Sequence, residues 1–303
     1  MNWKKLLPIL PTLIQLATST PCTTPKAAPQ TCNGQAAYCN RAYSNITQTG
    51  SHDSPFVGPL PQQNQNLPVE KQLDFGIRFL QAQTHKNPFD DSIIELCHTS
   101  CFLEDAGPLE GYLRTVKKWL DGHGNEVVTL LLTNQDSFSP ESFGSIFKKT
   151  GLDSYAFVPE SSPSTLPMDK WPTMGEMIES GKRLVVFLDY GASPSKVPYI
   201  LDEFAYYFET PYDVTDPSFP DCSINRPPNA SPAGRMYIMS HFLDVEIFGI
   251  KVPDRERAPR TNAATGPGSI GAQSTVCEGL YGRDPTVVLV DFVDQGDVLA
   301  AER

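Results

Sequence analysis

Two histidines are the residues best suited to chemistry, because each follows a strand-like run and sits in a turn. His52 follows residues 45–51 and precedes Asp53, and His98 lies between two cysteines, Cys97 and Cys101. Histidine titrates near neutral pH, so one ring can accept a proton while the other donates one. The pair indicates acid–base catalysis, and the simpler alternative, a loop histidine beside an Asp-Ser turn, stays open at this point.

The elements that must position these histidines alternate between strand-like and helix-like patterns. Nearly continuous apolar runs at residues 127–132 and 183–189 are typical of strands buried on both faces of a parallel sheet. Residues 109–120 carry apolar side chains at helical spacing and predict an amphipathic helix. We expect further strands at residues 45–49, 77–83, 93–97, 236–240 and 287–291, and further helices at residues 68–75, 140–149, 171–180 and 197–208.

This alternation, which runs without a break in composition, favours an α/β fold with a single TIM-type β/α barrel over an open doubly wound sheet. No Gly-x-Gly-x-x-Gly motif follows the first strand, so a dinucleotide site has no support. The polar residues 254–274 predict a long exposed loop. In a barrel the carboxyl ends of the strands form the catalytic face, and these polar residues fall at or just past such ends: His52, Gln83, His98, Asn134, Asp189, His241 and Asp291.

The charge balance limits the possible partners. The chain of 303 residues carries 24 basic and 35 acidic side chains, a formal net charge of -11. An acidic protein is poorly suited to bind nucleic acid or to be attracted broadly to anionic membranes. An anionic substrate must therefore be met locally, by a few placed residues.

The first residues predict a secretory signal. Lys4 and Lys5 precede an apolar run at residues 6–16, and residues 17–19 are small enough for a cleavage site. The run is too short for a membrane span. Its two prolines count against the signal-peptide interpretation, and its length and flanking residues count for it. We expect a signal peptide at residues 1–19, a cysteine-bearing leader at residues 20–43 and the barrel at residues 44–303, without a later span or lipid-anchor tail.

The seven cysteines fit a secreted chain, in which disulfides are the default interpretation. A zinc site is the weaker alternative, because no Cys-x-x-Cys pair occurs. Two sequons, at Asn45 and Asn229, are candidates for glycosylation. The closest spacings favour three pairs and leave Cys22 over, while the sequence leaves the connectivity open: Cys32 with Cys39, Cys97 with Cys101, and Cys222 with Cys277.

Five sequence strings occur in a fixed order along the chain: GSHDSPF at residues 50–56, QLDFGIRFL at 72–80, LCHTSC at 96–101, WPTMGEMI at 171–178 and GKRLVVF at 181–187. Together they resemble the X domain of the phosphatidylinositol-specific phospholipases C, and most closely the secreted fungal PLC-like phosphodiesterases. The resemblance extends from Cys32 to the end of the sequence. It implies a distorted (β/α)8 barrel and a role in lipid metabolism.

The resemblance also implies a mechanism. His52 would take the proton from an inositol 2-hydroxyl that attacks phosphorus, and His98 would protonate the leaving diacylglycerol oxygen, giving a cyclic inositol phosphate. Asp291 would orient His52, with strand capping as the alternative. Asp53 would form hydrogen bonds near the phosphate or within the turn. Because the attacking hydroxyl is internal, holding it near phosphorus supplies much of the rate.

The chain departs from the family at the groups that neutralise phosphate charge. Gln81 and Gln83 stand where animal-type members carry calcium ligands and bacterial members an arginine. Neither glutamine is a cation or a strong calcium ligand, so we expect no metal and no cofactor. Arg78 matches a family position, and a structural ion pair with a carboxylate such as Asp74 explains it as well as catalysis does. His85 is a possible substitute cation, with a surface role as the alternative.

The other polar candidates have structural alternatives. Asp189 and the neighbouring Tyr190 are placed to contact a polyol, or to begin a solvated loop. His241 fits a structural role at least as well as a catalytic one, and His123 fits a surface position. The full set of substrate-binding candidates is Arg78, Gln81, Gln83, Asn134, Asp189 and His241.

The sequence thus predicts a secreted, metal-independent phosphodiesterase of phospholipase C type. Two alternatives are a phosphodiesterase for a soluble or glycan-linked substrate, and a non-catalytic barrel that binds a phosphorylated or glycan ligand. The expected partner is a phosphodiester, such as phosphatidylinositol or a related inositol phosphodiester. We expect a monomer that binds no nucleic acid and makes at most peripheral contact with membranes, since residues 206–208 fit the core or the rim better than an anchor.

Overall fold

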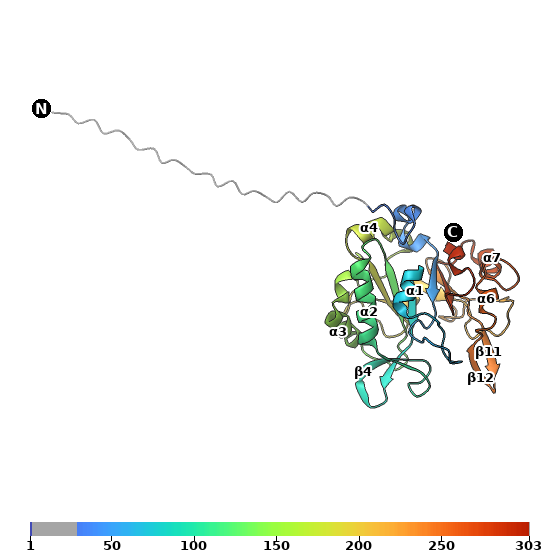
Figure 1. Ribbon diagram of the computed structural model, residues 1–303. Helices are drawn as coiled ribbons and strands as arrows, with labels where there is room; N and C mark the ends of the chain where they lie inside the picture. Colours follow the sequence, from blue (N-terminus) through green and yellow to red (C-terminus); the bar gives the residue numbers. More distant parts are fainter. Residues whose placement is uncertain (2–28, 303) are drawn as a thin grey trace.

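The computed structural model describes Met1 and residues 29–302 (Figure 1). The rest of the expected signal peptide and Cys22 lie outside the described residues. One eight-stranded parallel sheet forms the centre, in the order β8-β7-β6-β2-β1-β13-β10-β9. Its strands are β1 (Gln48–Ser51), β2 (Phe79–Ala82), β6 (Val128–Leu132), β7 (Leu184–Leu188), β8 (Ile200–Asp202), β9 (Tyr207–Glu209), β10 (Met236–Ser240) and β13 (Val287–Val290).

The sheet curls into a TIM-type barrel that stays open along one seam. β8 and β9 are its two edge strands, and the short helix α5 (Glu203–Tyr206) joins them. The expected α/β barrel is thereby confirmed. The barrel is distorted at the open seam between β8 and β9. Since all strands of the sheet are parallel, their carboxyl ends meet at one end of the barrel, where barrel sites form.

Helices pack around the outside of the sheet (Figure 1). The longest, α2, is amphipathic and buries Leu113, Val116 and Leu120 completely. α3 begins where Ser139 caps it and ends at Gly151 in the left-handed conformation, a frequent helix stop. Besides α5, the α-helices of the described chain are α1 (Val69–Phe75), α2 (Leu109–Gly122), α3 (Pro140–Thr150), α4 (Met174–Glu179), α6 (Ala258–Thr261) and α7 (Ile270–Tyr281).

The strands bury apolar side chains on both faces. In β6, Leu130 and Leu132 belong to the core between sheet and helices, whereas Leu131 belongs to the core inside the barrel. This is why the strand has a continuous apolar sequence instead of an alternating one. Tyr43, from the predicted leader, closes the interior: its hydroxyl lies 2.8 Å from that of Thr129.

Two smaller sheets lie outside the barrel. The first is the antiparallel sheet of β3 (Thr84–Asn87), β4 (Asp90–Cys97) and β5 (Asp105–Pro108), and the second is the hairpin of β11 (Asp244–Ile247) and β12 (Ile250–Pro253). Both extend from the same end of the molecule, at the bottom of Figure 1. They follow β2 and β10, so they rise from the carboxyl end of the barrel.

Three expectations from the sequence were wrong. The run at residues 93–97 is part of β4, which pairs in the small antiparallel sheet and not in the barrel. Residues 197–208 are not one helix but contain β8, α5 and β9, because short apolar runs fit either period. Residues 254–274 are not a simple exposed loop, since they contain α6 and the start of α7 and bury Thr261 and Gln273.

The disulfide pairs expected from spacing are confirmed: Cys32–Cys39, Cys97–Cys101 and Cys222–Cys277. The two sequon asparagines, Asn45 and Asn229, are exposed. Within the described part of the chain, no helix has the length and apolar character needed to span a membrane.

Candidate active site

His52 stands directly after β1, at the carboxyl end of the barrel. Its backbone N–H donates to the Val290 carbonyl, which continues the β1–β13 ladder by one residue. Its Nδ1 lies 2.9 Å from Asp291 Oδ1, and the ring of Phe242 stacks on the imidazole with centroids 3.7 Å apart. Because a carboxylate only accepts, Nδ1 carries a proton and Nε2 is the nitrogen left for chemistry.

His98 stands directly after β4, on a turn closed by the Cys97–Cys101 disulfide. Its Nδ1 lies 2.9 Å from the Gln62 carbonyl oxygen, to which it must donate. The ring of Phe56 stacks on it with centroids 5.3 Å apart. As in His52, Nε2 is the nitrogen available for proton transfer.

The two Nε2 atoms converge on one carboxylate oxygen. Asp53 Oδ2 lies 3.5 Å from His52 Nε2 and 3.4 Å from His98 Nε2, and Asp53 is fully buried. The two nitrogens are therefore at most about 7 Å apart, within reach of a single phosphodiester. Asp53 adopts a φ of 45°, a conformation that aspartate tolerates better than most residues.

The electrostatics of this centre favour a charged His52. Burial lowers the pKa of its imidazole, but the negative charges of Asp53 and Asp291, with the Asp291 hydrogen bond, outweigh burial and raise the pKa to about 9. Asn64 donates to Asp291 Oδ1 over 3.0 Å and holds that carboxylate in place. His52 therefore rests protonated at neutral pH and must release that proton before it can act as a base.

The two glutamines from β2 and the segment after it support Asp53. Gln81 Oε1 accepts from the Asp53 backbone N–H over 2.7 Å. Gln83 Nε2 donates to Asp53 Oδ2 over 2.8 Å, and Gln83 Oε1 accepts from the Thr99 N–H over 3.2 Å. Gln83 thus connects the His52 turn to the His98 turn, and both glutamines order the site without adding charge.

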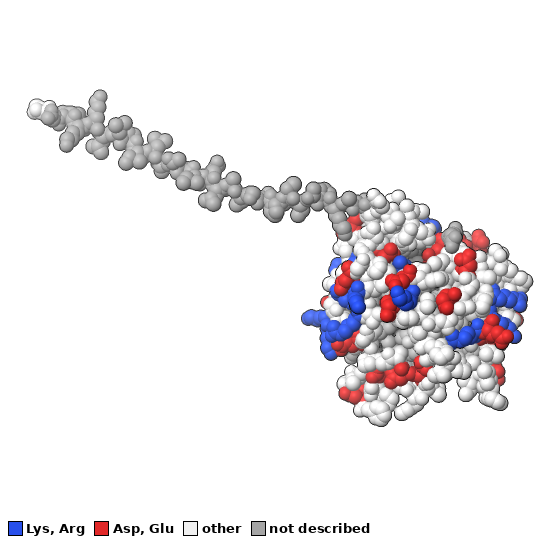
Figure 2. Space-filling model, viewed as in Figure 1, with Lys and Arg blue, Asp and Glu red and all other residues white. Residues whose placement is uncertain are grey.

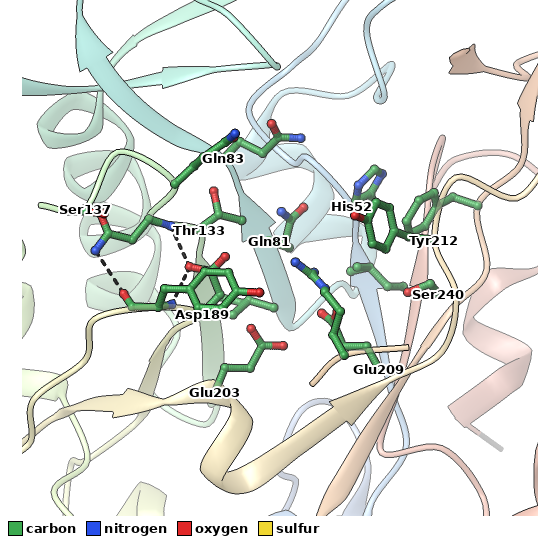
Figure 3. Close-up of a pocket in the computed structure, with 17 residues that line it drawn as sticks. His52, Gln81, Gln83, Thr133, Ser137, Asp189, Glu203, Glu209, Tyr212 and Ser240 are labelled. Atoms are coloured by element: carbon green, nitrogen blue, oxygen red, sulfur yellow. Dashed lines mark hydrogen bonds and ion pairs between the residues drawn. The ribbon is translucent and has the colours of Figure 1, made fainter. Parts of the chain in front are cut away.

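A cavity of about 490 Å³ opens beside His52 (Figure 3). Gln81 and Gln83 line one side of it. Asp189, directly after β7, and Glu203 and Glu209, from α5 and β9, line the other side. Asp189 Oδ1 accepts from the Asn134 N–H over 2.7 Å, and burial raises the pKa of Asp189 to about 6. Asn134 also lines the cavity, but its side chain is bonded to Phe138 and Tyr190 and orders the loops.

Most of the predicted site residues come together, although two of them do not. His52, Asp53, Gln81, Gln83, His98 and Asp291 form the centre, and Asn134 and Asp189 line the cavity. Arg78 precedes β2 at the opposite end of the strand, where its Nε donates to Glu126 over 2.8 Å. His241 is fully buried, with its ring nitrogens bonded to Gln273 and to the Thr261 carbonyl. The substrate-binding expectation for Arg78 and His241 is therefore corrected to a structural placement.

Other residues of the site were not anticipated from the sequence. Asn64 contacts Asp291, Phe242 covers His52, and Glu203, Glu209 and Arg226 line the cavity. Asn64 and Arg226 lie in irregular segments, where no periodic pattern marks a position as facing the site. Phe242 directly follows His241. The sequence located the end of this strand, but it indicated His241 as the site residue, and the residue at the site is Phe242.

The two remaining histidines, His85 and His123, do not line the cavity. His85 Nδ1 lies 3.4 Å from Asp136 Oδ2. In the described chain His85 makes no contact that would place its charge beside a phosphate at His52 and His98. His123 stacks on Trp119 at the end of α2. Among the described residues, no group of three or more His, Cys, Asp or Glu side chains has an arrangement that could hold a metal ion.

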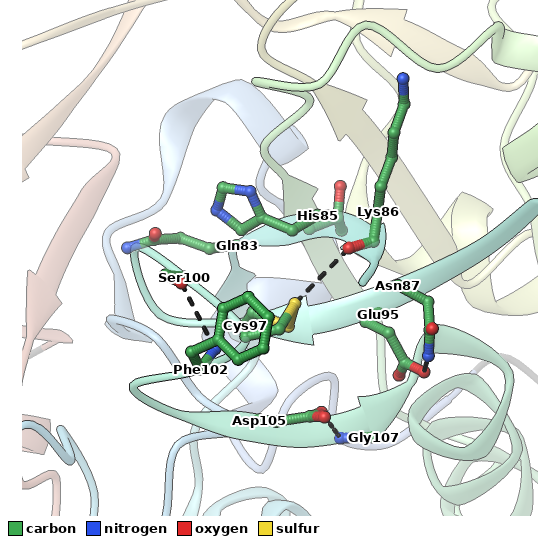
Figure 4. The surroundings of a disulfide bond; sticks show 12 residues. Gln83, His85, Lys86, Asn87, Glu95, Cys97, Ser100, Phe102, Asp105 and Gly107 are labelled. Carbon is green, nitrogen blue, oxygen red and sulfur yellow. Dashed lines mark hydrogen bonds between the residues drawn. A yellow bond between two sulfur atoms is a disulfide. The ribbon is translucent and has the colours of Figure 1, made fainter. Parts of the chain in front are cut away.

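The Cys97–Cys101 disulfide holds the His98 turn (Figure 4), so removing it tests that turn directly. Its sequence separation is 4, and closing so short a loop stabilises the fold by only about 2 kcal/mol. We expect Cys97→Ser with Cys101→Ser to lower the free energy of unfolding by about that amount and kcat/KM by roughly tenfold or more, because His98 loses its fixed position. Urea unfolding and steady-state kinetics measure the two effects.

The matched control is Cys32→Ser with Cys39→Ser. This disulfide spans a separation of 7 and lies in the leader, away from the histidines. It should cost similar stability and leave kcat/KM unchanged. Equal kinetic losses in the two double variants would show that the His98 turn does not depend on its disulfide.

The structure is a distorted barrel with two histidines at the carboxyl end of its sheet, and the sequence comparison identifies its family. Residues 38–303 match the family model described as PI-PLC X 1. The chain belongs to the PI-PLC X-domain family. Two proteins of Arthroderma benhamiae are similar to it: "PI-PLC X domain-containing protein 1", 53% identical over 95% of this chain and 93% of that protein, and an "Uncharacterized secreted protein", 44% identical over 88% and 61%.

Solved structures share the fold at low sequence identity. The phosphatidylinositol-specific phospholipase C of Listeria monocytogenes matches with a TM-score of 0.56 and 14% identity, over 88% of this chain and 96% of that one. A variant of the Staphylococcus aureus enzyme matches with a TM-score of 0.54 and 13% identity, over 87% and 93%. These likenesses support the distorted barrel independently of the sequence motifs.

Proposed function

We propose that this protein is a phosphodiesterase of phospholipase C type that cleaves a phosphodiester bearing a hydroxyl next to the ester oxygen. The single observation that carries the proposal is the convergence of His52 Nε2 and His98 Nε2 on Asp53, within 3.5 Å. An internal hydroxyl needs a base and an alkoxide leaving group needs an acid, and two such nitrogens a few ångströms apart can serve one phosphorus. Membership of the PI-PLC X-domain family supports the same chemistry.

The reaction follows from the two ring orientations. Neutral His52 takes the hydroxyl proton at Nε2 while the hydroxyl oxygen bonds to phosphorus. The bond from phosphorus to the leaving oxygen breaks, and that oxygen takes the proton from His98 Nε2. The products are a cyclic phosphate and a free alcohol. Asp291 stabilises the imidazolium of His52. His98 acts as the acid in its imidazolium form: Nε2 gives up its proton, and the Nδ1 proton stays hydrogen-bonded to the Gln62 carbonyl.

Phosphorus NMR tests the reaction. Wild-type protein incubated with phosphatidylinositol in mixed micelles should form a cyclic inositol phosphate, and glycerophosphoinositol tests a soluble diester in parallel. Turnover of the soluble diester alone would assign the enzyme to soluble substrates. If neither compound is converted under conditions in which the protein is folded, the barrel has a binding function and the proposed activity is refuted.

The same assay tests the expectation that no metal takes part. Because Gln81 and Gln83 occupy the positions of the family's calcium ligands and charged groups and are bonded to Asp53 and its neighbours, we expect EDTA and added calcium to change kcat/KM by less than about twofold. A loss of roughly tenfold or more with EDTA, restored by calcium, would contradict a metal-independent mechanism.

Exposed aromatic side chains near the site support a lipid substrate over a soluble one. Phe89, Phe102 and Phe248 are almost fully exposed, at the tips of the β3–β5 sheet, its disulfide loop and the β11–β12 hairpin. Figure 2 shows uncharged side chains at the two lower tips, with acidic groups just above one of them. Exposed phenylalanines are suited to insert into the boundary of a membrane.

We therefore expect Phe102→Ser with Phe248→Ser to lower the rate on phosphatidylinositol in phosphatidylcholine vesicles by about tenfold, because apolar contact area is lost. The rate on glycerophosphoinositol should stay within about twofold of wild type. Substituting the exposed Leu280, on α7, controls for the loss of surface apolar groups. An equal effect on both substrates would indicate damage to the site and not lost membrane contact.

Secretion is part of the same proposal. Three disulfides form in the described chain, as expected in an oxidising compartment, and a relative is named as a secreted protein. The exposed sequon asparagines are compatible with glycosylation there. We propose a secreted monomer with residues 1–19 as its signal peptide.

A further inference from the structure

Arg226 is the one lysine or arginine that lines the cavity within the described chain. It lies between β9 and β10, and its own carbonyl accepts from the Glu209 N–H over 2.8 Å. This backbone bridge fixes the Arg226 segment against the edge strand β9. The position is therefore ordered by the barrel although it lies in an irregular connection.

Glu209 and two aromatic rings hold the guanidinium group of Arg226 in place. Its Nε donates to Glu209 Oε2 over 2.5 Å, and Glu209 is only 2% exposed, whereas the Arg226 side chain is 27% exposed. The rings of Phe204 and Tyr212 flank the guanidinium carbon at 5.7 and 5.0 Å. Carboxylate and rings hold the group in one orientation, which lowers the entropy lost when it binds a ligand.

A second carboxyl group, that of Glu203, lies beside this ion pair. Glu203 is fully buried in α5, and neither of its oxygens accepts from any donor of the described chain. Burial and the neighbouring Glu209 raise the pKa of Glu203 well above its usual value. The shift favours the neutral form of Glu203 and so concentrates the negative charge opposite Arg226 on Glu209.

The outer edge of the guanidinium remains available. Among all described residues, none accepts a hydrogen bond from the two terminal nitrogens of Arg226, Nη1 and Nη2. A fork of N–H donors that is held by a carboxylate at Nε and open at its other edge matches the oxygens of a phosphate. The cavity of about 490 Å³ is roughly 10 Å across, the scale of one cyclitol phosphate between Arg226 and His52.

We propose that Arg226 binds the non-bridging oxygens of the substrate phosphate through Nη1 and Nη2 and supplies the positive charge that Gln81 and Gln83 do not. This inference rests on the proposed phosphodiesterase function and adds a residue to it. Charge builds on the phosphate oxygens in the transition state, so a fixed guanidinium stabilises the reaction more than the bound substrate. The competing explanation is that Arg226 serves only as the counter-ion of Glu209.

Binding measurements separate these two explanations without requiring turnover. Isothermal titration compares myo-inositol 1,2-cyclic phosphate with myo-inositol, which differs from it by lacking the phosphate. Arg226→Gln should weaken binding of the cyclic phosphate by roughly 30-fold and leave myo-inositol within about threefold. Arg226→Lys keeps the charge but loses the fork, and should fall between the two. Arg114→Gln, on the exposed face of α2, is the matched control with no expected effect.

Kinetics add the catalytic readout: kcat on phosphatidylinositol should fall by about 10²–10³ in Arg226→Gln, with a smaller change in KM. Equal weakening of both ligands, no weakening of either, or no binding of the cyclic phosphate by wild type would overturn the assignment. If Arg226→Gln does not fold, the same comparison is made with Arg226→Lys. If wild type turns over the substrate and the Arg226 variants bind and react as wild type does, only this inference is refuted. If wild type binds the cyclic phosphate through Arg226 but shows no turnover, only the proposed activity is refuted.

Discussion

Replacing His98 with alanine is expected to lower kcat/KM on phosphatidylinositol by about 10²–10⁴, and by far less on an inositol phosphodiester whose leaving group is p-nitrophenolate. The reason is the role given to Nε2, which protonates the departing alkoxide. p-Nitrophenolate is a weak base, because its nitro group delocalises the negative charge, and it leaves without that proton. Steady-state rates on the two substrates, taken at one pH, give the comparison.

His52→Ala provides the contrast, because the attacking hydroxyl is the same in both substrates. Its loss should be about 10²–10⁴ whichever group leaves. His123→Ala, on the surface at the end of α2, should behave as wild type after a check of its melting temperature. If the nitrophenyl substrate rescues His52→Ala instead of His98→Ala, the acid and base are assigned the wrong way round. Equal losses without rescue in either variant would remove the distinction between the two roles.

The geometry explains why the two histidines can differ in role while sharing Asp53. Nδ1 of His52 faces a carboxylate, and Nδ1 of His98 faces a backbone carbonyl. A negative partner stabilises the imidazolium that a base must become, whereas a neutral partner fixes the proton position without holding the positive charge as strongly. The base and the acid are therefore distinguished by their Nδ1 partners.

The features that the sequence predicted are those governed by local patterns. The buried strands β6, β7 and β13 and the amphipathic helix α2 follow from hydrophobic periodicity. The three disulfides followed from close spacing and the expected compartment. The histidine turns followed from a recurring motif. His52 and Asp291 meet because the parallel strands β1 and β13 place their carboxyl ends together, whereas His98 follows β4 of the small antiparallel sheet.

The features that escaped prediction depend on contacts between distant segments. The short strands β8 and β9 interrupt what reads as one helix, because their pairing with β7 and β10 outweighs local preference. Arg226 has no periodic or motif signal, and its role appears only when β9 brings Glu209 beneath it. Arg78, in contrast, lies in a motif, but it falls at the amino end of its strand and pairs with Glu126.

Our last prediction concerns pH. A free enzyme with His52 charged is inactive as a base. On the p-nitrophenyl substrate, which leaves without the His98 proton, kcat/KM should therefore rise about tenfold per pH unit below the pKa of His52 and level off above about 9. Asp291→Asn removes one of the charges that raise this pKa, and the midpoint of the rise should move to lower pH by roughly one unit or more. Rate profiles from pH 5 to about 10, with an NMR titration of the His52 ring, measure the shift.

The plateau at high pH should also fall in Asp291→Asn, by about 10²–10⁴, because an amide can donate to Nδ1 and so favour the unproductive tautomer. Other acidic groups near His52 remain in this variant: Asp53 beside Nε2, and Asp244 from β11, whose own pKa burial raises to about 7. Their charges keep part of the shift, so the midpoint should stay above that of an isolated buried histidine. An unchanged midpoint together with a lower plateau would mean that Asp291 orients the ring without setting its charge. An unchanged plateau would remove Asp291 from the mechanism.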